Sequence, residues 1–103
     1  MSRIDRITKM ENNLDVSAAA VRKLEEALDE YEAALPAYFK LMDYYTSHLW
    51  MDDYEADEAG KLPEDLKRGV LAEDTVYDLF TDNRLLVARM TALISKLIEK
   101  NRL

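Results

Sequence analysis

The sequence has no cysteine, a single histidine, two glycines and two prolines in 103 residues. Without cysteine the chain can form no disulfide, no thiolate nucleophile and no cysteine-ligated zinc site. The lone His48 has no second histidine with which to build a zinc site or a catalytic triad. There is also no glycine-rich phosphate loop. We therefore expect a protein that is not an enzyme and that uses no cofactor and no metal ion.

Long apolar runs are missing as well. No stretch approaches the roughly 18 apolar residues that a membrane-spanning helix needs. The first residues, MSRIDRITKMENN, lack the apolar segment of a secretory signal. We expect a soluble, cytoplasmic protein without membrane insertion, and the lack of cysteine fits a reducing compartment.

The net charge is −7, and most of the excess lies in one short segment. Residues 52–65 carry seven acids and one base. The chain has no basic stripe to neutralise phosphates, and neutralising phosphates dominates affinity for nucleic acid. We therefore expect no nucleic-acid partner.

A seven-residue repeat runs through the first half of the chain. One heptad position holds Ile7, Leu14, Val21, Leu28, Leu35, Met42 and Leu49, and the position three residues later holds Met10, Ser17, Leu24, Tyr31, Tyr38 and Tyr45. An apolar seam sustained over this many heptads predicts a long helix that packs in the manner of a coiled coil. We place this helix at about residues 3–50.

Pro36 interrupts the repeat, because a proline inside a helix removes a hydrogen bond and clashes with the preceding turn. The heptad phase passes Pro36 unshifted, and the segment EAALPAYF offers no Gly, Asn, Asp or Ser to close a hairpin. These features favour one helix kinked near residue 36. The alternative is a three-helix bundle split at Pro36.

A second amphipathic pattern predicts a last helix over residues 73–102. Between the two long helices we expect an irregular acidic loop, residues 51–72, with a short helical turn over 63–68 that starts at Pro63 and stops at Gly69. The whole is predicted to be one all-α domain, residues 1–103, in which the two long helices form an antiparallel hairpin. The first helix is the longer one. Its initial apolar residues lack a partner in the same chain, which predicts fraying, a fold-back or pairing with another chain, as in a homodimer: Ile4, Ile7, Met10 and Leu14.

The acidic loop is the candidate binding site. Tyr and Trp are favoured anchors at interfaces, and several aromatic side chains flank the acids. The acidic charge suits a basic protein partner, and the predicted contacts for a protein partner are Trp50, Asp52, Asp53, Tyr54, Asp57 and Glu58. The alternative interpretation is a small satellite core that holds a long loop in place.

Part of the loop follows the spacing of a calcium-binding EF-hand. Asp53, Glu55, Asp57 and Glu64 fall at positions 1, 3, 5 and 12 of that spacing. Glu58 stands where the motif requires glycine, so we do not assign an EF-hand. A looser divalent-cation site, with or without enzymatic activity, stays open as an alternative.

The run YYTSHLWMDDYEADEAGKLPEDLKRGVLAEDTVYDLF resembles the signature of an uncharacterised bacterial family. The resemblance covers most of the chain and is densest at Tyr44, Tyr45, Trp50, Asp57, Glu58, Gly60, Pro63, Asp65, Leu66, Gly69, Val70, Leu71, Glu73, Asp74 and Tyr77. Such proteins are short, acidic and helical, come mainly from Gram-positive bacteria and are catalogued as a domain of unknown function. The family that the chain resembles is associated with the BlpT protein of streptococcal bacteriocin-like peptide loci. The resemblance implies no established activity; it suggests an interaction or adaptor protein or, alternatively, an immunity or accessory factor of such a peptide system.

Overall fold

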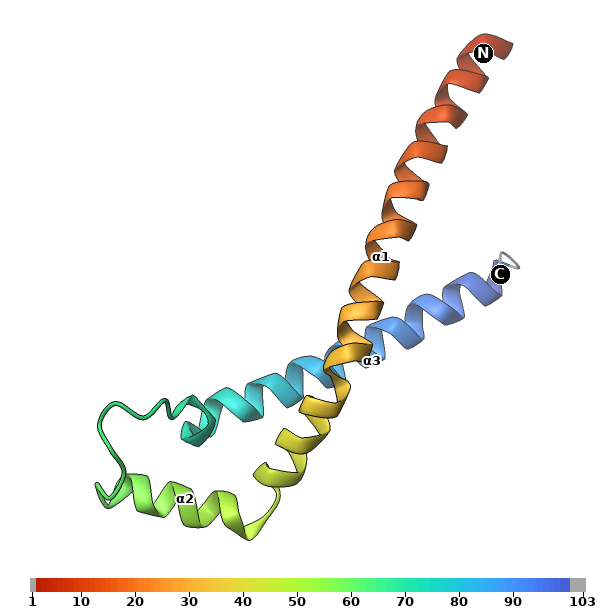
Figure 1. The fold of residues 1–103 in the computed structure, drawn as a ribbon. Coiled ribbons are helices and arrows are strands. Elements are labelled where there is room, and N and C mark those ends of the chain that lie inside the picture. The colour runs from red at the N-terminus through yellow and green to blue at the C-terminus, as the bar shows by residue number, and fades with distance from the viewer. Residues whose placement is uncertain (1, 101–103) are drawn as a thin grey trace. The chain divides into compact units, whose positions relative to one another are not determined.

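The computed structural model describes residues 2–100, and within them it contains three α-helices, one short 3-10 helix and no strand (Figure 1). The predicted all-α class is confirmed. The chain divides after Asp43 into two compact units, which we call the N-terminal unit and the C-terminal unit. No helix in the described part of the chain is both long and apolar enough to cross a lipid bilayer.

The first helix, α1, spans Arg3–Tyr45 and contains Pro36 in its interior. It begins after Ser2, whose hydroxyl oxygen accepts a hydrogen bond of 3.1 Å from the backbone N–H of Asp5 and so caps the helix start. The continuous heptad pattern predicted passage through the proline correctly. The alternative of a bundle split at Pro36 is wrong.

The chain instead breaks ten residues later, and this corrects the predicted helix over 3–50. Ser47 adopts an extended backbone, with φ −94° and ψ 164°. Its N–H and its hydroxyl both donate to the carbonyl of Tyr44, at 3.0 and 2.7 Å. These bonds satisfy an acceptor at the end of α1, and the next helix, α2, begins directly after Ser47 and spans His48–Glu58. The predicted loop over 51–72 is therefore helical as far as Glu58.

Gly60 ends α2 in a Schellman motif. Its φ of +71° is in the left-handed region, which glycine enters without steric penalty. The N–H of Gly60 donates to the carbonyl of Asp57, and the N–H of Lys61 donates to the carbonyl of Ala56, both at 3.0 Å. The terminal carbonyls of α2 are thus paired at the point where the chain leaves the helix.

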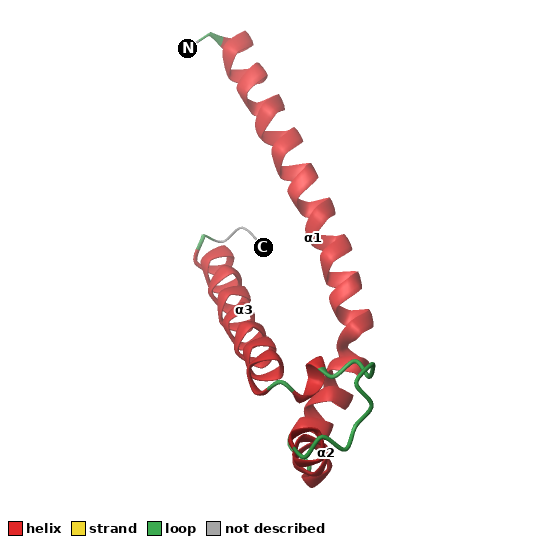
Figure 2. Ribbon diagram, turned by 90° about the vertical axis from the view of Figure 1, so that its left-hand side faces the viewer, coloured by secondary structure: helices red, strands yellow, loops and turns green. Residues whose placement is uncertain are grey.

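The true loop follows Gly60 and leads to the last helix (Figure 2). Within the segment 63–68, where a short helical turn was predicted, the chain forms a turn closed by a 3.2 Å hydrogen bond from the N–H of Leu66 to the carbonyl of Pro63. Gly69, which we expected to stop that turn, begins the 3-10 helix η1, Gly69–Leu71. The last helix, α3, spans Glu73–Glu99, and residues 101 and 102 of the predicted helix lie outside the described residues.

The core of the C-terminal unit is small and draws one residue from each of three elements. Trp50 of α2, Leu71 of η1 and Val76 of α3 are its buried apolar side chains, at 7%, 6% and 3% exposure. With so few buried residues, the unit depends on directed contacts around this core for its rigidity.

Candidate functional site

Trp50 organises the C-terminal unit. Its indole N–H donates a hydrogen bond of 2.9 Å to the carbonyl of Val70. Its ring stacks on Tyr54, with centroids 5.2 Å apart and an interplanar angle of 18°. Tyr45 meets it edge to face at 5.0 Å, and Phe80 of α3 meets Tyr45 in the same manner at 5.5 Å. Such aromatic pairs add roughly 0.5–1.5 kcal/mol each beyond the area they bury.

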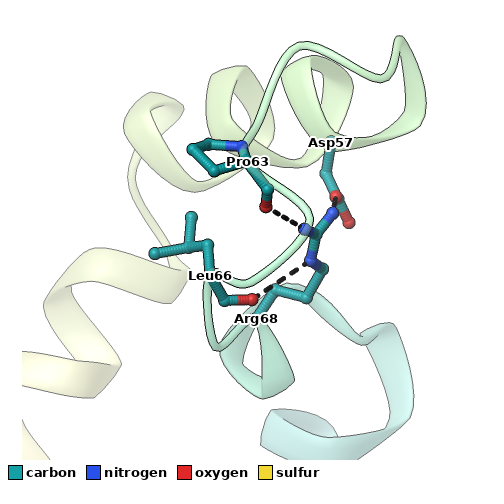
Figure 3. A network of polar contacts seen from close by, with 4 residues as sticks. All are labelled: Asp57, Pro63, Leu66 and Arg68. Carbon is teal, nitrogen blue, oxygen red and sulfur yellow. Dashed lines mark hydrogen bonds and ion pairs between the residues drawn. The ribbon is translucent and has the colours of Figure 1, made fainter.

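Arg68 fixes the loop to α2 (Figure 3). Its guanidinium forms an ion pair with the carboxylate of Asp57 and donates to the carbonyl of Pro63. Its Nε donates a further hydrogen bond of 3.3 Å to the carbonyl of Leu66. The fork of guanidinium donors is suited to holding several oxygens at fixed angles. One side chain therefore ties both ends of the Pro63–Leu66 turn to the preceding helix.

Two tyrosine phenols are held by carboxylates. The hydroxyl of Tyr44 donates to Asp53 at 2.6 Å. Burial first, then this hydrogen bond and the negative charge of Asp53, raise the pKa of Tyr44 from 10.0 to about 12. The hydrogen bond from Tyr54 to Glu73 is the largest cause of a raised pKa at Tyr54, followed by the negative charge of Glu58. Both phenols are thereby kept in the neutral, donating form.

A cavity of about 320 Å³ opens beside this aromatic cluster. It is lined by three aromatic side chains, Tyr45, Trp50 and Tyr77, and by the carboxylates of Glu73 and Asp74 in the first turn of α3. Tyr77 is largely exposed. We call this site the aromatic–acidic pocket. A π face attracts a cation through its quadrupole, and a nearby carboxylate attracts it through its charge, so the pocket has the chemistry of a cation site.

A second cavity, of about 290 Å³, is lined mainly by loop and η1 side chains, among them Leu62, Leu66 and Val70, and also by Tyr44 and Asp53. Its apolar walls come from the segment that Arg68 holds in place. We assign it to the packing of the loop on the helices.

The six predicted contact residues have different environments, and all lie on α2 instead of in a loop. Trp50 is buried, and Tyr54 is partly covered by the stacking contact. Asp53 and Asp57 hold Tyr44 and Arg68. Of the six, Asp52 and Glu58 are exposed, and their side chains make no hydrogen bond or ion pair with another residue described by the structure.

The pocket residues that α3 contributes were not predicted from the sequence. Glu73, Asp74 and Tyr77 lie within one turn at the start of this helix and bring two charges and an aromatic ring to the same place. Neither acid was among the predicted contacts. Their spacing of three and four residues from Tyr77 was the available signal that they share a face with it.

The EF-hand-like spacing does not build a metal centre. Asp53, Glu55 and Asp57 lie on α2, and Glu64 lies in the loop after Gly60. Within residues 2–100, no three His, Cys, Asp or Glu side chains lie together in a group that could hold a metal ion. The carboxylates of this region are instead distributed among the phenols, Arg68 and solvent.

The residues predicted to drive self-association lie on α1 in the N-terminal unit. Ile4, Ile7, Met10 and Leu14 are all exposed, by 53% or more. The aromatic side chains of α1 beyond them, Tyr38 and Phe39, contact each other edge to face at 6.0 Å. They do not belong to the C-terminal unit that contains the Trp50 cluster.

Comparison with known proteins gives a family without an assigned activity. No curated protein and no solved structure shows a significant match to the chain. Residues 7–93 match the family model described as "Domain of unknown function (DUF4298)". The match takes in most of α1, all of α2 and the loop, and most of α3. The predicted membership of a family of unknown function is confirmed: the chain belongs to the DUF4298 family of uncharacterised domains.

Proposed function

We propose that the chain is a non-enzymatic interaction protein whose C-terminal unit binds a basic segment of a partner protein at the aromatic–acidic pocket. The observation that carries this proposal is the convergence of Tyr45, Trp50 and Tyr77 with Glu73 and Asp74 around one cavity. An arginine or lysine side chain matches both features of that cavity.

The attraction has two components. A cation over an aromatic face gains roughly 0.5–2 kcal/mol, depending on how well water is excluded. The exposed acids Asp52 and Glu58 lie on α2, the helix that also carries Trp50, and add negative charge to the C-terminal unit. Charges of this kind mainly raise the association rate and select among partners, and salt screens them.

The pocket is also held in shape before any partner arrives. Trp50 is fixed by its hydrogen bond to Val70 and by stacking on Tyr54. Preorganisation of this kind favours affinity because fewer side chains lose freedom on binding. The internal bonds of Asp53 and Asp57 support the same scaffold, so we assign these two acids to structure and the exposed acids to binding.

The test is a titration with a synthetic peptide of alternating arginine and glycine, measured by calorimetry. The pocket variant carries Asp74→Asn and Tyr77→Leu. The control carries Glu26→Gln and Phe39→Leu, which make the same change of charge and aromaticity on exposed positions of α1. We expect binding by the wild type and by the control, and a loss of at least about tenfold, or 1.4 kcal/mol, in the pocket variant.

A peptide with glutamine in place of arginine serves as the ligand control and should not bind. Equal binding of the arginine peptide to the wild type and the pocket variant would show that the aromatic–acidic pocket is not the binding site. No binding to the wild type would exclude a basic peptide as the ligand.

A further inference from the structure

The exposed seam of α1 needs a partner. Every residue from 3 to 34 of this helix is exposed, and none of its 43 residues is buried. Its heptad positions nevertheless carry large apolar side chains, among them Met10, Leu14, Leu24 and Leu28, at 47–60% exposure. An apolar stripe of this length, left in water, would cost free energy roughly in proportion to its area.

The helix lengths show that α3 of the same chain is too short to cover the whole apolar seam of α1. The 27 residues of α3 fall 16 short of the 43 residues of α1. Even a complete pairing of the two would leave about 24 Å of α1, at about 1.5 Å per residue, without a facing helix. Some of the seam must be covered by something other than α3 of the same chain.

The charges along α1 favour an antiparallel pair of these helices over a parallel pair. Residues 25–32 contain five acids and no base, whereas residues 3–9 contain three bases and one acid. A parallel pair of α1 helices would place the two acidic segments side by side, and like charges at such distances repel. An antiparallel pair places each acidic segment opposite the basic start of its partner.

The heptad positions then select a register. In an antiparallel pair the two kinds of seam position face each other across the interface. Setting Leu14 against Leu24 of the partner also sets Met10 against Leu28 and Ser17 against Val21. It brings residues 25–32 opposite residues 6–13, which carry two bases, Arg6 and Lys9, and one acid, Glu11. No seam residue between 10 and 28 is left without a counterpart.

The centre of this arrangement is built from small side chains. The two-fold axis passes between Ser17 and Val21, and Ala18 and Ala20 flank the seam there. Side chains of this size let two helices approach to the short end of the usual 8–10 Å interaxial distance. We infer that a second copy of this chain covers the seam, as an antiparallel α1 pair in this register. This inference concerns the N-terminal unit and does not rest on the pocket.

Disulfide cross-linking tests whether a second copy covers the seam and whether the two α1 helices run antiparallel. The natural chain has no cysteine to interfere. One protein carries Leu14→Cys, and a second, lengthened by a tag so that its mass differs, carries Leu24→Cys. We expect a covalent heterodimer when the two are mixed and oxidised, and little cross-linking of either protein alone. The matched control is Ala19→Cys mixed with Leu24→Cys, because residue 19 points away from the seam and should not cross-link.

A parallel pair would give the opposite pattern, with each single variant cross-linking to itself, and would overturn the inference.

Sedimentation supplies the second test. Leu14→Glu places an unpaired carboxylate in the seam and should raise the dimer dissociation constant by about a hundredfold or more. Val16→Glu, at an equally exposed apolar position off the seam, should leave it nearly unchanged. A wild-type chain that stays monomeric at every concentration would also overturn the inference.

Discussion

The indole N–H of Trp50 donates a 2.9 Å hydrogen bond to the carbonyl of Val70, twenty residues further along the chain. The bond joins α2 to the segment η1 and holds the largest side chain of the small core in one orientation. The same ring lines the aromatic–acidic pocket. Stability and the proposed binding surface therefore depend on the same residue.

Replacing Trp50 by Phe should lower the free energy of unfolding by about 1–3 kcal/mol, because the change leaves the carbonyl of Val70 without its donor and removes part of the ring contacts. Urea unfolding followed by circular dichroism would measure this loss. Tyr77→Phe removes a hydroxyl from an exposed side chain and should change the stability by less than about 0.5 kcal/mol. Equal effects of the two substitutions would show that the indole bond contributes little.

The Arg68 network predicts a local effect. Arg68→Lys keeps the charge but cannot hold Asp57 and the carbonyls of Pro63 and Leu66 together. The side chains of Arg68 and Asp57 are 33% and 19% exposed, so the ion pair alone is worth little. We expect a loss of about 1 kcal/mol, seen as faster amide hydrogen exchange over residues 61–68. Lys61→Ala, in the same loop, should leave that exchange unchanged, and unchanged exchange in Arg68→Lys would contradict the assigned role.

The two glycines give a matched pair. Gly60 has a φ of +71°, whereas Gly69 has no such backbone angle, and neither has another atom within 4 Å of an added Cβ. Gly60→Ala should destabilise the chain by about 1–2 kcal/mol, the cost of the left-handed conformation for an L-residue. Gly69→Ala should cost less, and thermal unfolding of both variants measures the difference. A Gly69→Ala variant that is the less stable of the two would rule out this explanation.

Because the pKa values of Tyr44 and Tyr54 are raised in the folded chain, its stability against unfolding should depend on pH in the alkaline range. The pKa of Tyr44 is raised to about 12, from 10.0, by burial and by Asp53. The unfolded chain therefore loses this proton at lower pH than the folded chain. The stabilisation is fully present below pH 10 and is lost as the pH rises from 10 to 12. The pKa of Tyr54 is raised too and acts in the same direction.

Titrating phenolate absorbance in the folded chain, with Tyr44→Phe for comparison, should show that one late-titrating phenol disappears in the variant. If the phenol that Tyr44→Phe removes titrates at an ordinary pH, and the late-titrating phenol remains, the raised pKa does not belong to Tyr44.

Periodicity predicted the long elements because it reports on many residues at once. The seven-residue repeat indicated α1 and its passage through Pro36, and the apolar face after Glu73 indicated α3. The same repeat concealed the break at Ser47, because Leu49 continues the heptad phase into α2. Hydroxyl bonding by Ser47 to the carbonyl of Tyr44 overrides the periodic pattern, and such a bond has only a weak sequence signal.

The roles of the acids could not be predicted from their density. Asp53 meets Tyr44, nine residues earlier, and Asp57 meets Arg68, eleven residues later. Both partners are brought close only by the turn at Ser47 and the loop after Gly60. The pocket has the same origin, since Tyr45 and Tyr77 reach one cavity through the packing of α2, η1 and α3 around Trp50.

The most direct test of the proposed binding surface uses the single tryptophan of the chain. Its indole N–H gives one signal in a nitrogen-labelled NMR spectrum, so it reports on the pocket without overlap. On adding the arginine–glycine peptide, we expect this signal and the amides of Tyr45, Glu73, Asp74 and Tyr77 to shift together and saturate. A stationary indole signal, with shifts confined to the acidic residues 25–32 of α1, would contradict it.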